Sequence, residues 1–271
     1  MLSACGGGNG GTTTSFTSWS TVEPSSVVVT EGLSEQDGVV SPSFIGTTAT
    51  ITVDANRHWT NLVLRTPDTT VDVDFVGVLA GGFLDAASQD LASSAVVADP
   101  VPLGYQYQTF GIWETQSATA NTTGAFSVGA PSTSVPNTGS ATFQGKLAGF
   151  YVDPSGLRYY AFGDMQVTAD FANRSLDLAA SNTAIKQNLS DLGTPRPDLN
   201  LSGQLSYAAG TNSFSGGVTT VGTSLGNLSG TTSGQFYGPS ALELGGVFSL
   251  TDPLNPNSPE SYTGAYGAQV P

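Results

Sequence analysis

The chain has few charged side chains for its length. Only 10% of its 271 residues are Asp, Glu, Lys or Arg, whereas an ordinary soluble domain carries about 25%. Basic residues are the scarcer kind, with seven against 21 acidic ones, and the formal net charge is −14. Such a surface repels phosphate groups, so the composition disfavours nucleic acids and anionic lipid headgroups as partners.

Cysteine and histidine are nearly absent as well. The single cysteine, Cys5, excludes a disulfide framework within the chain and any multi-cysteine metal cluster. The single histidine, His58, excludes a multi-histidine zinc site and bis-histidine haem ligation. No run of the sequence approaches the roughly 18 apolar residues of a membrane-spanning helix. Attachment to a membrane would therefore need another route.

Cys5 offers that route. It follows Leu2-Ser3-Ala4 and precedes Gly6-Gly7-Gly8, and this context resembles a bacterial lipobox, the end of a signal peptide whose cysteine is lipidated. Met1 leaves no room for the basic and apolar regions of such a peptide, so this interpretation requires a start further upstream. The alternative is a chance match. We expect residues 1–20 to hold the lipobox remnant and a flexible Gly/Thr tether.

Glycine is abundant, with 34 residues that follow no collagen period. Short β-branched runs separated by turn residues, such as Ala49-Thr50-Ile51-Thr52-Val53, predict strands in the first part of the chain. Phe83 to Val96 has the apolar spacing of a helix. Asp99-Pro100-Val101-Pro102 then interrupts the pattern. We therefore expect a smaller β-rich domain at residues 21–104.

Beyond residue 104 the strand pattern becomes regular. In the run Leu199–Tyr207 apolar residues alternate with polar ones, which is typical of a half-buried antiparallel strand. The number of such runs predicts an all-β fold, with an antiparallel up-and-down β-barrel of about eight strands at residues 105–271. The strand-like runs are Tyr105–Trp113, Ser140–Val152, Leu157–Phe171, Ser175–Ala180, Leu199–Tyr207, Ser213–Val221, Leu228–Tyr237, Gly245–Leu250 and Tyr262–Ala268.

The same alternation would also describe a transmembrane barrel whose apolar face meets lipid. Gly203, Gly230 and Gly234 lie on the apolar faces, where they add nothing to lipid partitioning. A small packed barrel, in contrast, needs small residues among large ones to fit its interior. We therefore favour a soluble barrel filled by its own side chains, with Ser, Thr, Gln and Asn on its outer face.

One long motif lies near the C-terminus. It consists of Gly234-Gln235-Phe236-Tyr237-Gly238-Pro239 followed by Ala241-Leu242-Glu243-Leu244-Gly245-Gly246. Gly238-Pro239 favours a turn, Glu243 can accept hydrogen bonds near a barrel rim, and Gly245-Gly246 allows close approach of another strand. The motif therefore identifies a fold better than a ligand. The residues to which we assign this structural role are Gly234, Phe236, Tyr237, Gly238, Pro239, Glu243, Gly245 and Gly246.

This motif resembles the barrel domain of the transferrin-binding protein B family of Gram-negative surface lipoproteins. Tyr107–Trp113, Ala141–Gly145 and Leu201-Ser202-Gly203 are similar to further parts of it, so the resemblance covers most of the chain and is strongest after residue 104. It implies a single lobe in which a handle-like domain lies beside the barrel. It also implies lipidation at Cys5 and a position in the outer membrane, facing the cell exterior.

The resemblance further implies a non-enzymatic protein that binds an extracellular ligand, either a protein or haem, in iron or haem acquisition or in host-protein binding. A TonB-dependent outer-membrane transporter is the implied membrane partner. His58, beside Trp59, is the candidate haem ligand, and the alternative is a loop histidine without a ligand. The chain has only two lysines, Lys146 and Lys186, so transferrin-specific activity does not carry over residue by residue. The alternative function is a structural or interaction lipoprotein of the cell envelope with no small-molecule ligand.

Two further patterns carry little chemistry. Gly222-Thr223-Ser224-Leu225-Gly226 has the spacing of a hydrolase nucleophile elbow, but no strand and helix flank it, and we interpret it as a chance match. Asp72 and Asp74 lie on the same side of one expected strand. They could assist cation binding, although a solvated strand face is the simpler interpretation.

Overall fold

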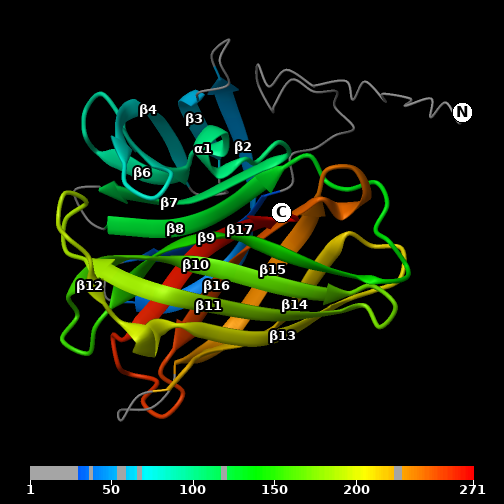
Figure 1. Ribbon diagram of the computed structural model, residues 1–271. Helices are drawn as coiled ribbons and strands as arrows, with labels where there is room; N and C mark the ends of the chain where they lie inside the picture. The colour runs from blue at the N-terminus through cyan, green and yellow to red at the C-terminus, as the bar shows by residue number, and fades with distance from the viewer. Residues whose placement is uncertain (1–29, 37–38, 54–58, 66–68, 117–120, 223–227) are drawn as a thin grey trace, which may run out of the picture.

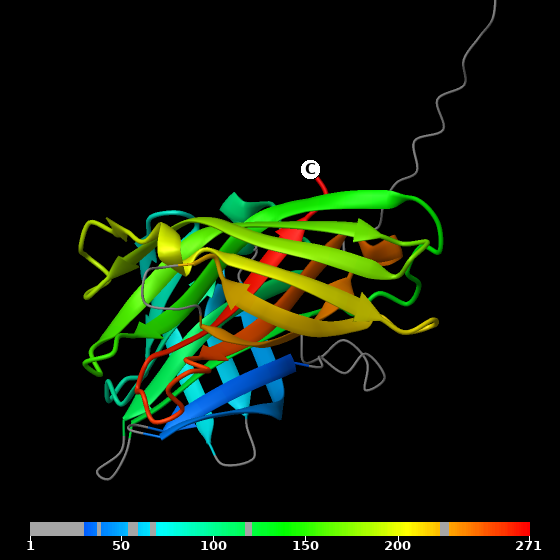
Figure 2. The same cartoon turned by 90° about the horizontal axis from the view of Figure 1, so that it is seen from below.

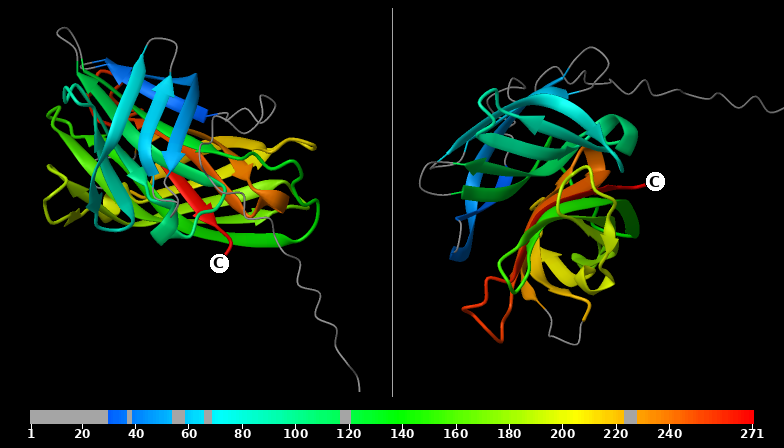
Figure 3. Two further views of the ribbon diagram at one scale, coloured as in Figure 1. Left: turned by 90° about the horizontal axis from the view of Figure 1, so that it is seen from above. Right: turned by 90° about the vertical axis from the view of Figure 1, so that its left-hand side faces the viewer.

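A computed structural model describes residues 30–36, 39–53, 59–65, 69–116, 121–222 and 228–271. The described part is almost entirely β-structure, which confirms the expected fold class. Its helical elements are α1 (Pro100–Leu103) and two 3-10 turns, η1 (Pro197–Leu199) and η2 (Pro239–Ala241). Within these residues, no helix is long and apolar enough to span a membrane. The strands form two antiparallel sheets that curl separately and lie against each other (Figure 1, Figure 3).

The first sheet, the N-terminal barrel, is built from consecutive strands. Each strand pairs with the next, and β1 also pairs with β8, so the sheet closes on itself. Its interior is filled by a cluster that includes Trp59, Leu62, Val73 and Trp113. Its strands are β1 (Thr30–Gln36), β2 (Val39–Val53), β3 (Trp59–Arg65), β4 (Thr70–Leu79), β5 (Phe83–Ala87), β6 (Ser93–Ala98), β7 (Gln108–Gln116) and β8 (Asn121–Gly129).

The second sheet, the C-terminal barrel, confirms the expected up-and-down barrel. It closes because β9 pairs with both β10 and β17, while β10 also pairs with β11. Figure 2 shows this barrel from below, with its tilted strands wrapped into a wall. Its strands are β9 (Ser140–Val152), β10 (Arg158–Asp170), β11 (Ser175–Lys186), β13 (Leu201–Tyr207), β14 (Ser213–Thr220), β15 (Ser229–Tyr237), β16 (Glu243–Thr251) and β17 (Ser261–Gln269), with the two-residue β12 (Thr194–Pro195) beside the end of β11.

The interior of the C-terminal barrel holds the apolar side of the alternating strands. On β13, Leu201 and Leu205 are buried while Ser202 and Gln204 are exposed, as the sequence pattern predicts. One end of the interior is filled by aromatic rings around Phe236. The ring centroids of Phe143, Phe171, Tyr207 and Phe214 lie 5.3–6.3 Å from that of Phe236.

The expected helix at Phe83–Val96 is wrong. These residues form β5, a turn and most of β6, and the two strands pair with each other from Phe83 to Ala98. Leu91, which would lie on the apolar face of the helix, is 76% exposed and has a φ of 59° in the turn. The helical spacing arises because two buried strands and a turn happen to place apolar residues about four apart.

The expected place of the Tyr105–Trp113 run is also wrong. Its strand, β7, pairs with β6 and β8 and so belongs to the N-terminal barrel, and the first strand of the C-terminal barrel begins at Ser140. The reason is that β7 packs against the second barrel and is buried on both faces over Gln108–Trp113. Its sequence therefore resembles that of a barrel-core strand. The extent of independently folding domains stays a prediction.

Candidate functional site: the junction of the two barrels

The two barrels meet over a continuous apolar contact, which we call the junction. It is formed where β7 and β8 of the N-terminal barrel face β9, β16 and β17 of the C-terminal barrel, with further side chains from β5 and β6. In Figure 3 the green strands of the first barrel lie directly on the red and orange strands of the second. The buried side chains of the junction are Phe83, Val96, Ala98, Tyr105, Phe110, Ile112 and Ala125 on one side and Ala148, Phe150, Val247 and Ala265 on the other.

The motif residue Glu243 connects the barrels by hydrogen bonds. Its side chain is 2% exposed, and its two carboxylate oxygens accept from the backbone N–H groups of Gln106 (2.6 Å) and Tyr107 (3.1 Å), just before β7 begins. The neighbouring Gln108 donates its side-chain N–H to the carbonyl oxygens of Leu244 (2.7 Å) and Ala268 (3.0 Å). Hydrogen bonds to a buried carboxylate are among the stronger ones in proteins. Glu243, the first residue of β16, thus connects its barrel to the segment before β7 of the other barrel.

Gly245 and Gly238 allow the barrels to approach. A Cβ atom on Gly245 would lie 2.3 Å from Oε1 of Gln108 and 2.6 Å from Oγ of Ser127, both on the facing barrel. Gly238 has a φ of +73°, and a Cβ there would lie 2.4 Å from the ring of Tyr107. Gly245 is required because a side chain would not fit there. Gly238 is required for the same reason and also because its backbone is left-handed.

The remaining motif residues divide between the junction and the barrel interior. Tyr237 faces the junction, where its hydroxyl lies 3.0 Å from Oγ of Ser127. Pro239 begins η2. Gly234 and Gly246 face inward, where a Cβ on either would lie within 2.8 Å of a Phe214 or Tyr266 side-chain atom. Phe236 is the centre of the aromatic cluster described above. The sequence identified these residues but not the second barrel that half of them contact.

An ion pair crosses the edge of the junction. Arg158 on β10 pairs with Glu114 on β7, and Glu114 also accepts from the hydroxyls of Tyr160 (3.2 Å) and Ser94 (3.0 Å). Burial, together with the charge of Glu114, raises the pKa of Tyr160, which therefore stays protonated as a donor. Tyr160 also lines a hollow beside the junction.

That hollow, the junction hollow, has a volume of about 720 Å³. Its walls come from both barrels: Val78, Leu79, Ala80 and Asp85 from β4, β5 and the turn between them, and Tyr160, Lys186 and Asn188–Leu192 from β10, β11 and the segment that follows β11. Leu192 is 96% exposed and Val78 is 75% exposed. Burial raises the pKa of Asp85, since a carboxylate beside apolar atoms loses hydration.

Sequence reasoning missed the junction hollow, although one signal for it exists. The Val-Asp-Val-Asp alternation of β4 buries Val71 and Val73, but the pairing register shifts between Phe75 and Gly77. The polar alternation ends at Phe75, where the bulge interrupts the ladder, and the apolar Val76 and Val78 beyond it are exposed. The end of this alternation is the signal in the sequence, and the pairing shows its cause.

Only some of the residues that the sequence suggests for ion or small-molecule binding lie in the described part of the chain. Cys5, His58 and most of Gly222–Gly226 lie outside the described residues, so lipidation, haem ligation and the elbow-like pattern stay predictions. Asp72 and Asp74 are exposed, and the side-chain N–H group of Asn61 donates to both, at 2.9 and 3.0 Å. In the described part of the chain, no three His, Cys, Asp or Glu residues form a group that could hold a metal ion.

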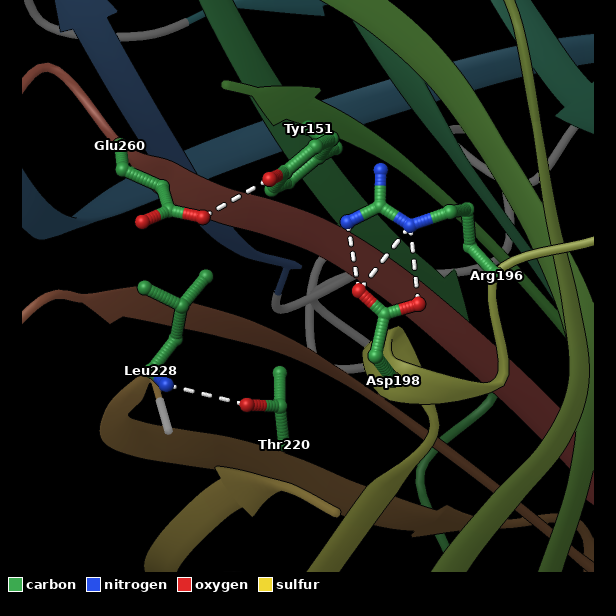
Figure 4. A network of polar contacts seen from close by, with 6 residues as sticks. All are labelled: Tyr151, Arg196, Asp198, Thr220, Leu228 and Glu260. Carbon is green, nitrogen blue, oxygen red and sulfur yellow. Dashed lines mark hydrogen bonds and ion pairs between the residues drawn. The ribbon is translucent and has the colours of Figure 1, made fainter. Parts of the chain in front are cut away.

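Polar contacts surround the barrel end opposite the Phe236 cluster (Figure 4). Arg196 makes a forked pair with Asp198, with nitrogen–oxygen distances of 2.5–3.0 Å, and its guanidinium lies 5.1 Å from the ring centre of Tyr151. The Tyr151 hydroxyl donates to Glu260 at 2.7 Å. Burial and this hydrogen bond raise the pKa of Tyr151 to about 12. The side chains in the network satisfy one another, which indicates a structural role.

Known proteins share sequence features with this chain. Residues 135–270 match the family described as the C-lobe and N-lobe beta barrels of Tf-binding protein B. Transferrin-binding protein B of Haemophilus influenzae (strain 86-028NP) is 24% identical over 205 residues, which cover 70% of this chain and 31% of that protein. The chain therefore spans about a third of the length of this curated relative.

Solved structures share the fold of both barrels. TbpB from Haemophilus parasuis Hp5, in a mutant form, aligns with a TM-score of 0.57 at 17% identity, over 89% of this chain and 45% of that one. Isotype 1 TbpB from serogroup B Neisseria meningitidis aligns with a TM-score of 0.52 at 16% identity, over 90% and 44%. Intact Ap-TbpB, with N and C lobes, gives 0.52 at 16% identity, over 89% and 46%. At these identities the likeness extends to the fold alone.

Proposed function

Because the chain belongs to the family of transferrin-binding protein B β-barrels, we propose that it is a surface-exposed outer-membrane lipoprotein that binds an extracellular ligand. The proposed role is iron or haem acquisition, or binding of a host protein, without enzymatic chemistry. The observation that carries the proposal is the junction hollow, which presents apolar side chains from both barrels to solvent. Exposed apolar groups around a concave site are typical of interaction surfaces.

The junction hollow suits a protein ligand for two reasons. Leu192 and Val78, one from each barrel, are both largely exposed to solvent, so a ligand that covers both gains apolar burial at about 25 cal/mol per Å². The walls are also held in place beforehand, because the Glu114–Arg158 pair and the apolar junction connect the barrels directly beside them. A site that is ordered before binding loses less conformational entropy on binding.

The experiment measures binding of the purified chain to iron-loaded transferrin, haemoglobin and hemin by surface plasmon resonance. The variants Val78→Asp and Leu192→Asp place a charge on either wall of the junction hollow. Leu254→Asp is the matched control, because Leu254 is 82% exposed but lines no part of the hollow. We expect saturable binding to one protein ligand, weakened about ten-fold or more by each wall variant and unchanged by the control.

Equal loss of binding in the control variant would contradict a site at the junction hollow. Absence of binding to every probe would favour the alternative function, a structural or interaction lipoprotein. Hemin also tests His58: a Soret band that His58→Ala removes would assign a haem ligand, and an unchanged band would exclude that residue.

Membrane attachment is tested in cells. The natural gene, expressed with any upstream coding sequence in a Gram-negative host, should give a product that incorporates labelled fatty acid and resists release from outer membranes by salt. Cys5→Ser should abolish both properties, since lipidation needs the thiol. Co-purification with a TonB-dependent transporter after crosslinking would identify the proposed membrane partner. Fatty-acid incorporation that persists in Cys5→Ser would contradict the anchor.

A further inference from the structure

A second hollow, the barrel-end groove, lies at the end of the C-terminal barrel that the Phe236 cluster fills. Its volume is about 610 Å³, which lies within the range of about 300–1,000 Å³ typical of small-molecule sites. One wall is the connection between β8 and β9, from Ser132 to Asn137. The other walls are the turns between β10 and β11 and between β13 and β14.

Hydrogen bonds hold the walls in position. Ser132 donates its backbone N–H to the carbonyl of Phe236 (2.9 Å) and its hydroxyl to that of Gly238 (2.6 Å). The side-chain N–H of Asn212 donates to the carbonyl of Ser132 at 3.1 Å and so ties one turn to the connection. The groove is therefore formed in the absence of a ligand, which lowers the entropy that binding must overcome.

The groove has an apolar floor. Phe171 and Tyr207 line it while being buried themselves, and their rings pack on Phe236 beneath. Because the aromatic cluster fills the barrel at this end, the groove is a blind site and not the mouth of a channel. The C–H face of a ring-shaped ligand could rest on this floor.

Most wall residues are polar, and one residue among those that line the groove, Arg174, is charged. Arg174 is exposed, and no carboxylate of the described residues lies within ion-pair distance of it. The nearby carboxylate of Asp170 accepts from the backbone and side-chain N–H groups of Asn173, at 3.0 and 2.7 Å. A free guanidinium in a chain of net charge −14 is available for a carboxylate, which it binds in a forked geometry.

The backbone of Arg174 is held in a sparsely populated conformation. Its φ is 55°, a left-handed value that is uncommon for residues other than glycine. Its carbonyl accepts from the N–H of Tyr207, the last residue of β13, at 3.2 Å, and this contact holds the turn in place. Strained residues kept by their surroundings are enriched at ligand sites.

We propose that the barrel-end groove binds a saccharide that carries a carboxylate. Arg174 pairs with the carboxylate, the hydroxyls and amides of the walls, such as Thr133 and Asn137, hydrogen-bond to sugar hydroxyls, and the floor contacts the ring. A single cation matches a monoanionic group, whereas a phosphate dianion would favour a cluster of basic residues. This site is separate from the junction hollow and does not depend on the function proposed for it.

The test is calorimetric titration of the full chain with 3′-sialyllactose and, in parallel, with lactose. We expect saturable binding of 3′-sialyllactose and binding of lactose that is about ten-fold weaker, the effect of losing one charge-assisted contact. Arg174→Asn should weaken 3′-sialyllactose to the level of lactose, and asparagine tolerates the left-handed backbone. Ser134→Trp, which fills the groove from an exposed wall position, should abolish binding of both.

Arg65→Asn is the matched control, because Arg65 is an exposed arginine on β3 of the other barrel, and it should bind 3′-sialyllactose as the unmodified chain does. Circular dichroism checks that each variant is folded. Three results would overturn the proposal: no saturation at about 10 mM sugar, equal affinity for the two sugars, or displacement of 3′-sialyllactose by inorganic phosphate as efficiently as by free sialic acid. The last result would identify a simple anion site.

Discussion

Strands that face solvent differ from strands that lie between the two barrels. On β11 and β13, buried and exposed residues alternate almost without exception. On β16 and β17, eight successive residues are buried, because one face lines the barrel interior and the other meets the N-terminal barrel. Alternation therefore reports exposure to water on one side of a strand. Where both faces are covered, the alternation disappears and small residues such as Gly245 allow the contact.

The largest effect is expected inside the C-terminal barrel. Phe236→Ala removes the ring at the centre of four aromatic contacts, and truncation of a buried Phe lowers the free energy of unfolding by about 3–5 kcal/mol. Leu254→Ala, on an exposed loop, should change it by less than about 0.5 kcal/mol. Guanidinium unfolding measures both variants. Similar values for the two would show that the interior is not packed as described.

Alanine substitutions at two glycines compare how tightly the chain is packed at the junction and on the solvent-facing wall of the C-terminal barrel. Gly245→Ala should destabilise the protein by about 1–3 kcal/mol, since the new methyl group overlaps side chains of the facing barrel. Gly217→Ala on β14 should be neutral or stabilising by up to about 1 kcal/mol, because a Cβ there has no atom nearer than 4.0 Å. The two midpoints of thermal unfolding should therefore move differently. Equal shifts in the two variants would contradict a close contact between the barrels at Gly245.

The forked pair at the solvated barrel end gives a smaller effect with a defined pH dependence. The side-chain hydrogen bond from Arg196 lowers the pKa of Asp198, so the pair stabilises the folded chain above the unfolded value of about 3.9. This contribution is lost as the pH falls through the lower folded pKa. Asp198→Asn should cost less than about 1 kcal/mol at pH 7, and the difference from the unmodified chain should vanish in acid. A difference that grows on acidification would contradict the assignment.

The smallest effect has the opposite sign. Burial raises the pKa of Asp85 in the junction hollow, so the folded chain binds a proton there more readily than the unfolded chain, and its stability decreases as the pH rises through this region. Asp85→Asn should therefore stabilise the protein at pH 7, by less than about 1 kcal/mol because the group is partly solvated. The gain should diminish below about pH 4. Destabilisation at pH 7 would show that Asp85 has a favourable partner in the fold.

The same comparison explains which parts of the structure the sequence predicts. Seven of the long strands from Ser140 onward are predicted to within two residues at each end, whereas β11 continues six residues beyond the expected end at Ala180. The hairpin at Phe83–Ala98 and strand β7 are wrongly assigned, because the burial of these segments shows no regular alternation that would distinguish a strand from a helix or one barrel from the other. The motif around Glu243 is recognisable, but its partners, Gln106 and Tyr107, lie more than 130 residues away. Contacts at that separation leave no local pattern.

The two hollows could not be predicted from the sequence for the same reason. Each is lined by segments that meet only in space: β4 with the segment after β11 in one, and the β8–β9 connection with two barrel turns in the other. Val78 and Arg174 are ordinary surface residues in the sequence. Only a bulge in one case and a left-handed turn residue in the other indicate that they line a concave surface.

The Glu243 motif joins two separately closed barrels into one unit, and unfolding followed by two signals measures this coupling. Trp59 and Trp113 lie in the interior of the N-terminal barrel, so in a Trp19→Phe background tryptophan fluorescence follows that barrel, while far-UV circular dichroism follows both. The guanidinium unfolding curves from the two signals should coincide in this background and separate when Glu243→Ala is added. Curves that still coincide, at an unchanged midpoint, would contradict this coupling.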